Sequence, residues 1–128
     1  MKELYYSRAS CGDDLYFAYG DVHRVAALCL SRGGYVCTPN ALMLEHARTD
    51  ACFARLLSQA SLLVPDGVGA CALLRLSGQR ASRCAGVDLG MAIAREAARR
   101  GIPIFLYGGH AGVAERAARR LRARFPTL

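Results

Sequence analysis

Two apolar runs in the sequence each end in a small cluster of polar residues that could bind or activate a substrate. The first run leads to Thr38 and Asn40, and the second leads to Asp66. A hydroxyl and an amide suit hydrogen bonds to a sugar or a phosphate, and a carboxylate at a strand end suits proton abstraction. Because parallel α/β sheets bind ligands at the carboxyl ends of their strands, we expect the three side chains to converge on one crevice.

Asn40 and Asp66 also have a structural interpretation as helix caps. Asp66 precedes a helical pattern, and Asn40 stands before the helix expected to begin near Ala41. Asp and Asn are among the preferred N-cap residues, so the residues alone favour capping at both positions. Capping and ligand contact are compatible at a strand end, and the chemical role therefore stays open.

A glycine-rich turn and one arginine are further candidates for binding an anion. Gly108, Gly109 and Gly112 follow an apolar run and precede a helix, where backbone N–H groups can approach a phosphate. The turn has neither the G-x-G-x-x-G spacing nor a Walker sequence. His110 either touches such a phosphate or lies exposed. Arg83 lies in a polar connection, where it could clamp a diphosphate or form a surface salt bridge.

An alternation of strands and helices is predicted to position these residues. Apolar runs predict parallel strands, and the segment bounded by Gly101 and Gly108 is the strongest of them. The pattern indicates an α/β fold in one domain, residues 1–128, with a parallel sheet covered by helices on both faces in a Rossmann-like, three-layer α/β/α arrangement. The expected strands cover 35–38, 62–65 and 102–107, and the expected helices 22–30, 41–59, 68–76, 88–100 and 113–124.

The composition places the chain among globular proteins. It has 128 residues, of which 53% are hydrophobic, so it can bury a core and is not a disordered chain. No apolar run reaches the roughly 18 residues of a membrane-spanning helix, and the N-terminus lacks the apolar segment of a signal peptide. We therefore expect a cytoplasmic location.

The net charge of +7 comes almost wholly from arginine, since Lys2 is the only lysine. The arginine bias fits either the nucleotide composition of the genome or a phosphate-rich partner. Half of the sixteen arginines follow helical spacing, as on a solvated helix face. They fall at positions 95, 99, 100, 116, 119, 120, 122 and 124.

The cysteines show neither a metal-binding nor a disulfide pattern. Their spacing is irregular and contains no Cys-x-x-Cys pair, so we expect reduced, buried cysteines that act as small hydrophobic residues. The six positions are 11, 29, 37, 52, 71 and 84.

Several short motifs, in consistent order and spacing, resemble the WecG/TagA/CpsF glycosyltransferases. They span about residues 35–128, whereas residues 1–34 match poorly. The motifs are Thr38-Pro39-Asn40, Val64-Pro65-Asp66-Gly67-Val68-Gly69, Arg83-x-x-Gly86-x-Asp88-Leu89, Phe105-Leu106-Tyr107-Gly108-Gly109 and Phe125-Pro126.

The resemblance implies an inverting transferase that moves an N-acetylhexosamine, typically N-acetylmannosamine, from a UDP-sugar to a polyprenyl-diphosphate-linked sugar. Such enzymes build teichoic acid, enterobacterial common antigen or capsule precursors at the inner face of the cell membrane. By similarity, Asp66 is the general base and Thr38 and Asn40 place the donor. Arg83 and the turn at Gly108 and Gly109 contact its diphosphate or nucleotide. No metal or other cofactor is implied, in agreement with the absence of an Asp-x-Asp motif.

Members of that family continue beyond the Phe-Pro segment, so the resemblance implies a chain truncated at its C-terminus and lacking part of the site. Apolar surface exposed by such truncation would favour a homo-oligomer. Two alternatives remain. A nucleotide-binding module without catalysis would keep the glycine turn without needing Asp66, and a nucleic-acid-binding domain would use the arginines of 116–124. No aromatic interleaving accompanies those arginines, which makes nucleic acid the least favoured partner.

Overall fold

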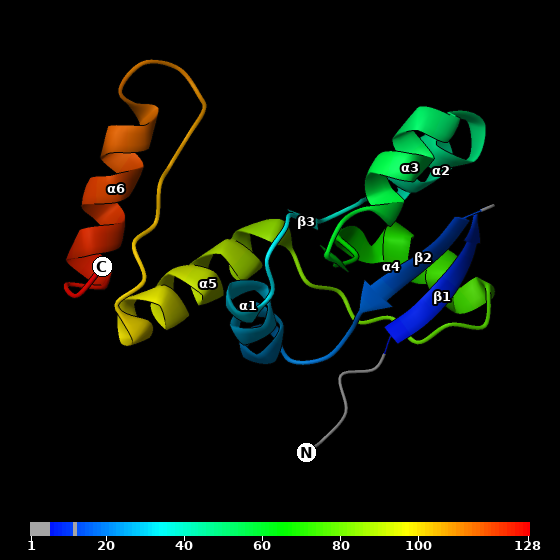
Figure 1. The fold of residues 1–128 in the computed structure, drawn as a ribbon, viewed down its shortest axis with the longest axis horizontal. Coiled ribbons are helices and arrows are strands. Elements are labelled where there is room, and N and C mark those ends of the chain that lie inside the picture. Colours follow the sequence, from blue (N-terminus) through cyan, green and yellow to red (C-terminus); the bar gives the residue numbers. More distant parts are fainter. Residues whose placement is uncertain (1–5, 12) are drawn as a thin grey trace.

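The computed structural model describes residues 6–11 and 13–128, which form a small sheet and six helices (Figure 1). The strands are short, and the longest helix has 15 residues. Strands cover β1 Tyr6–Cys11, β2 Asp13–Ala18, β3 Val36–Cys37 and β4 Leu62–Leu63. Helices cover α1 Val22–Ser31, α2 Ala41–Thr49, α3 Ala51–Ser58, α4 Gly67–Leu76, α5 Gly86–Arg100 and α6 Val113–Arg124.

The sheet has the strand order β1-β2-β4-β3. β2, β4 and β3 are parallel, as the sequence predicts for an α/β fold, and Phe17 of β2 stands opposite Leu63 of β4. β1 pairs with β2 in an antiparallel hairpin that the sequence analysis does not predict. The parallel part of the sheet therefore begins earlier in the chain than expected.

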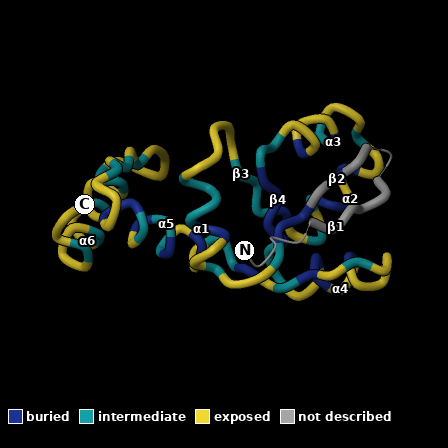
Figure 2. The backbone as a smooth tube through the Cα atoms, turned by 60° about the horizontal axis from the view of Figure 1, so that its bottom comes forward, coloured by how far each residue is buried: buried dark blue, intermediate teal, exposed yellow. Residues whose placement is uncertain are grey.

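Helices cover both faces of the sheet, which confirms the three-layer arrangement. Neighbouring residues of β4 point to opposite faces, so Leu63 belongs to one apolar cluster and Leu62 to the other. The first cluster includes side chains of α2, α3 and α4, and the second includes those of α1 and α5. Figure 2 shows the buried backbone concentrated in this region.

Most helix ends lie where the sequence places them. Asp21 caps α1 by accepting hydrogen bonds from the backbone N–H groups of His23 and Arg24, at 2.9 and 3.3 Å. Gly101 ends α5 in the left-handed conformation. The single helix predicted over 41–59 is wrong, because Asp50 adopts an extended conformation and caps a second helix by accepting from the N–H of Phe53.

The predicted strand at 102–107 is wrong in this structure. Residues 102–107 run as an extended segment outside the sheet, and Phe105 and Tyr107 are 88% and 95% exposed. The segment and α6 form a C-terminal arm beyond α5, away from the strands (Figure 1). α6 has no buried residue, so this arm adds little to the core.

The described cysteines are free thiols, as expected, but they are not uniformly buried. Cys71 and Cys84 are buried, whereas Cys52 is exposed on α3. Burial raises the pKa of the Cys84 thiol, and the negative charge of Asp88 adds to the rise. The side chain of Cys11 lies outside the described residues. A structural, unreactive role therefore fits the two buried thiols only.

Glu96 and two arginines close the last turn of α5. Arg99 donates to the Glu96 carboxylate from Nε and Nη2, at 2.9 and 2.6 Å, and Arg100 donates from Nε at 2.6 Å. These bonds lower the pKa of Glu96 from an ordinary value of 4.5 to about 2. The contact stabilises the folded state above pH 4.5, and this contribution is lost as the pH falls towards about 2.

Replacing Glu96 with Gln should therefore lower the thermal stability at neutral pH and flatten its dependence on pH in the acid range. Thermal unfolding of both proteins, followed by circular dichroism between pH 2 and 7, measures the effect. We expect the two melting temperatures to converge at the acid end. A difference that stays constant across the range would show that the carboxylate charge contributes nothing.

Candidate functional site

The predicted site lies where β3 and β4 end. The chain passes from β3 through Thr38 into α2, and from β4 through Asp66 into α4. The backbone N–H of Asp66 donates to the carbonyl of Pro39 at 3.0 Å, which holds the two strand ends side by side. Thr38 and Asp66 are both half-buried. The structure thus brings these two predicted residues to one edge of the sheet.

Asp66 is the N-cap residue of α4, yet its side chain makes no capping hydrogen bond. Its Oδ2 instead accepts a long bond of 3.5 Å from the backbone N–H of Gly86, at the start of α5. The carboxylate thus points across the sheet edge to a second helix. Since little of its hydrogen-bonding capacity is used within the protein, it remains available to accept a proton.

Gly86 allows α5 to approach β3 closely. A Cβ atom added at Gly86 would lie 3.2 Å from the Thr38 hydroxyl oxygen, tighter than most Cβ contacts. The Thr38 hydroxyl, the Asp66 carboxylate and the first N–H of α5 therefore share one small region. Gly86 belongs to one of the sequence motifs, but its role could not be predicted. The contact between Gly86 and Thr38 joins residues that are distant in the chain.

Asn40 caps α2, as its structural interpretation predicts. Its Oδ1 accepts a hydrogen bond from the backbone N–H of Met43 at 3.0 Å. The side chain is exposed and its amide NH₂ group points from the same strand end as Thr38. Capping thus occupies the oxygen and leaves two donors for a ligand.

Arg83 lies exposed in the connection between α4 and α5. Its charge reaches the thiol of Cys71 in α4: burial raises the pKa of Cys71, Arg75 and Arg83 oppose the rise, and Asp66 adds to it. Arg83 and Asp66 therefore both act on the first half of α4. The backbone N–H of the next residue, Cys84, donates to the carbonyl of Pro65 at 3.2 Å, which ties this connection to the end of β4.

The connection 77–85 is held near its middle, at Ala81 and Ser82, by contacts that the sequence does not predict. Arg75 donates from Nε and Nη2 to the carbonyl of Ala81, at 3.2 and 2.8 Å. The hydroxyl of Ser82 accepts from the N–H of Gly20 at 2.7 Å. Arg75 follows helical spacing and gives no sign of this role. Its contacts nevertheless fix the path of the loop that carries Arg83.

α2, α4 and α5 begin beside this site at the edge of the sheet, and two of these helices lack a side-chain cap. α4 and α5 have no capping hydrogen bond from Asp66 or Ala85, whereas Asn40 caps α2. Uncapped helix N-termini present oriented N–H donors and a partial positive charge, which suit a phosphate group. The edge thus combines anion-binding backbone with a carboxylate and a hydroxyl.

The glycine turn is not part of this arrangement. Gly108, Gly109 and Gly112 all adopt positive φ angles, of 109°, 77° and 79°, and they lie in the C-terminal arm, where Gly108 and Gly109 are exposed and Gly112 is half-buried. Figure 1 shows this turn at the start of α6, in the arm and apart from the strands. His110 is likewise exposed there. The structure therefore separates Gly108 and Gly109 from the other predicted site residues.

No group of three or more His, Cys, Asp or Glu side chains in residues 6–11 and 13–128 is arranged to hold a metal ion. No helix in this part of the chain is both long enough and apolar enough to cross a membrane.

The fold is that of a Rossmann-like α/β protein, a class whose members bind their ligands at the carboxyl ends of parallel strands. A narrower assignment comes from sequence comparison. Residues 18–128 match the model of the glycosyl transferase WecG/TagA/CpsF family, and the chain belongs to this family. It is a glycosyltransferase of cell-surface polysaccharide synthesis. The match includes α1, which the motifs found in the sequence leave out.

Proposed function

We propose that the protein is an inverting glycosyltransferase that moves an N-acetylhexosamine, in the simplest case N-acetylmannosamine, from a UDP-sugar to a polyprenyl-diphosphate-linked sugar. The observation that carries the proposal is the Asp66 carboxylate, which makes no capping hydrogen bond to α4 and lies beside Thr38 and the N-terminus of α5. The family supports the transfer of a sugar. Teichoic acid or a related surface polysaccharide would be the product of the pathway.

Asp66 acts as the general base in this proposal. The acceptor hydroxyl attacks the anomeric carbon of the donor, and its proton passes to the Asp66 carboxylate. A new carbon–oxygen bond forms while the bond from the anomeric carbon to the diphosphate oxygen breaks. The electron pair of that bond leaves with UDP, and the single displacement inverts the anomeric configuration.

The leaving diphosphate needs positive charge, which an arginine and two helix N-termini would supply. Arg83 would bind the diphosphate through its guanidinium, and the uncapped N-termini of α4 and α5 would donate N–H groups. Thr38 and Asn40 would bind the donor sugar. The proposal therefore includes no divalent cation.

A lipid-linked acceptor would also find apolar surface at this edge. The helices α2, α4 and α5 each expose an aliphatic side chain in the first turn. Leu42 of α2 is 81% exposed, Val68 of α4 is 78% exposed and Val87 of α5 is 79% exposed. Exposed apolar groups beside a polar site suit an acceptor that joins a polar sugar diphosphate to an apolar lipid. Since such a lipid is held in the membrane, the reaction would take place at the inner membrane face.

Replacing Arg83 with Ala should weaken UDP binding by about 10- to 100-fold, because hydrogen bonds to charged groups contribute about 1.5–3 kcal/mol. Thermal unfolding of the wild-type chain with UDP, UDP-N-acetylmannosamine, UDP-N-acetylglucosamine and NAD tests the donor class, and calorimetric titration gives the affinities. We expect the melting temperature to rise with UDP and with at least one of the two UDP-sugars.

Arg119, an exposed residue of α6, provides the matched control. Its replacement with Ala removes the same charge from the same kind of exposed side chain and should leave UDP binding unchanged. Stabilisation by NAD alone, or salt-sensitive binding of nucleic acid without binding of UDP-sugars, would contradict the proposed function. An equal loss of affinity in both variants would reduce the role of Arg83 to net charge.

A further inference from the structure

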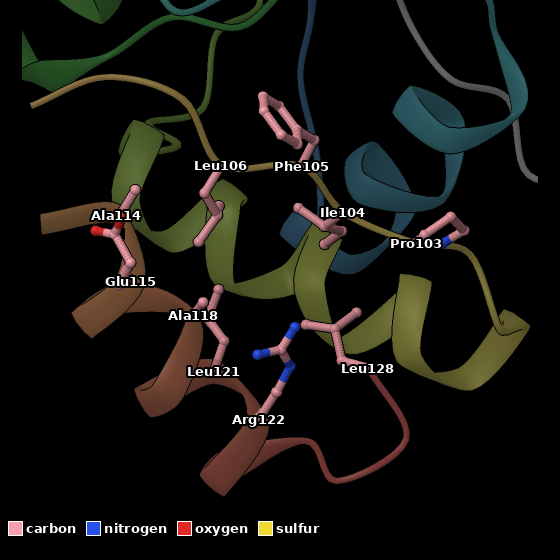
Figure 3. Close-up of a pocket in the computed structure, with 10 residues that line it drawn as sticks. All are labelled: Pro103, Ile104, Phe105, Leu106, Ala114, Glu115, Ala118, Leu121, Arg122 and Leu128. Carbon is pink, nitrogen blue, oxygen red and sulfur yellow. The ribbon is translucent and has the colours of Figure 1, made fainter. Parts of the chain in front are cut away.

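The extended segment 102–107 has the character of a strand without a partner. It alternates in burial, since Ile104 and Leu106 are half-buried while Phe105 and Tyr107 are exposed. In Figure 3, Ile104 and Leu106 point towards α6 and Phe105 points the opposite way. Among the described residues, no backbone–backbone hydrogen bond involves 103–109. A continuous apolar run such as residues 102–107 is typical of a strand buried on both faces, although here one face is exposed.

The packing of this segment against α6 is loose. A groove of about 350 Å³, open to solvent, lies between the two, lined on one side by Ile104 and Leu106 and on the other by Ala118 and Leu121 (Figure 3). The present contact therefore leaves apolar surface of both elements without close packing.

The sheet has a free edge at β3. Tyr35, Cys37 and Pro39 direct their carbonyls to the β4 side, where they accept from the N–H groups of three residues. Those donors are Ser61, Val64 and Asp66. Because successive residues of a strand direct their backbone groups to alternate sides, Val36 and Thr38 direct theirs away from β4. β3 is the last strand in the sheet order, so within residues 6–11 and 13–128 that side has no neighbouring strand.

The topology predicts which strand belongs at this edge. α1 joins β2 to β3, passes over β4, and shares its apolar cluster with α5 on the same face of the sheet. Connections between parallel strands are right-handed in about 98% of cases. With α5 beside α1 on that face, a right-handed connection from β4 leads in the direction of β3. The strand that follows α5 therefore belongs beyond β3.

We propose that residues 102–107 dock on the free edge of β3 within the same chain, as a fifth strand parallel to it. The left-handed Gly101 provides the turn by which the segment leaves α5. Docking would cover Phe105 and Tyr107 and use the outward backbone groups of Val36 and Thr38. It would also carry the turn at Gly108 and Gly109, with the uncapped N-terminus of α6, to the strand ends beside Thr38.

The docked strand would complete the anion-binding edge of the site. A fourth helix N-terminus would join those of α2, α4 and α5, and the glycine turn would bring backbone N–H groups to the diphosphate. This part rests on the proposed function, whereas the docking itself does not. A test must therefore report the docking without any ligand.

Tryptophan fluorescence gives such a test, because the chain contains no tryptophan. In Phe105→Trp, the new side chain replaces one that is 88% exposed in the arm. If the segment docks, the indole is covered, its emission shifts to shorter wavelength and quenching by acrylamide falls. Leu76→Trp is the matched control, since Leu76 is 86% exposed at the end of α4 and should report a solvated indole.

A second variant tests the edge itself. Val36→Pro, added to Phe105→Trp, removes an N–H that points away from β4, and proline is tolerated on the open side of an edge strand. We expect this double variant to keep its secondary structure by circular dichroism while the indole emission returns to that of Leu76→Trp. An indole that stays covered in the double variant would overturn docking on β3.

Three other results are decisive. Emission of Phe105→Trp equal to that of Leu76→Trp, with and without UDP, would overturn the proposal. A blue shift that grows with protein concentration, together with a dimer in sedimentation, would assign the edge to a second copy and overturn docking within one chain. A concentration-independent blue shift supports the docking, and its increase on addition of UDP supports the role of the turn. A blue shift unaffected by UDP, in a protein that binds UDP, would reject only that role.

Discussion

Replacing Asp66 with Asn is expected to lower the rate of sugar transfer by about 10²- to 10⁴-fold, the usual contribution of a positioned general base. The amide has nearly the shape of the carboxylate and can accept the bond from Gly86, but it cannot take the proton of the acceptor hydroxyl. Transfer of labelled hexosamine to a lipid-linked acceptor measures the rate. The loss should appear in kcat, while the affinity for UDP, measured by calorimetry, stays close to that of the wild type.

Asp21→Asn is the matched control for this variant. Asp21 is also an N-cap residue, and it accepts two backbone hydrogen bonds that an asparagine side chain can replace. It therefore loses the same charge from the N-terminus of α1, a helix that follows β2, without loss of the cap. Equal activity of the Asp66→Asn and Asp21→Asn proteins would contradict the role of Asp66 as the base.

The sequence predicts the parts of this fold that depend on local chemistry. Asp21 and Asn40 cap the helices that they precede, because a side-chain oxygen two or three residues from the first N–H groups needs no tertiary contact to find them. α6 begins and ends at the predicted residues, since its pattern is strongly helical. The positions of Thr38 and Asp66 at strand ends follow from the same local patterns.

Features that depend on distant parts of the chain are not predicted. Asp50 divides one apolar helical pattern into α2 and α3, and only the extended conformation of that residue reveals the break. β2 has no strong local strand pattern in the sequence, and its place in the parallel sheet comes from its pairing with β4. In 102–107 the local strand pattern is present, but membership of a sheet requires a partner edge.

The chemical roles show the same division. Asn40 and Asp66 have the same capping interpretation in the sequence, yet the structure gives a cap bond to Asn40 and none to Asp66. The difference arises because α5, 20 residues away in the chain, brings the N–H of Gly86 to the Asp66 carboxylate. A single sequence cannot show this contact. The contact with Gly86 favours a chemical role for Asp66, which the spacing of residues in the sequence does not do.

The position of Asp66 depends in turn on the packing of the sheet behind it. β4 ends three residues before Asp66, and Leu63 of β4 pairs with Phe17 of β2. Phe17 is fully buried in the cluster that joins β2 to α2, α3 and α4. Its aromatic ring therefore links the central strands to the helices on one face, and its loss would loosen the support for both strand ends of the site.

Phe17→Ala is expected to lower the free energy of unfolding by about 3–5 kcal/mol, because it removes buried apolar surface and leaves a cavity that the short strands cannot close. Urea unfolding followed by circular dichroism measures the change. Leu76→Ala provides the control, since that side chain is 86% exposed and its loss should change stability by less than about 0.5 kcal/mol. A loss below about 1 kcal/mol in Phe17→Ala would mean that the cluster closes around the missing ring. In that case β2 would not be the element that holds β4, and thus Asp66, in place.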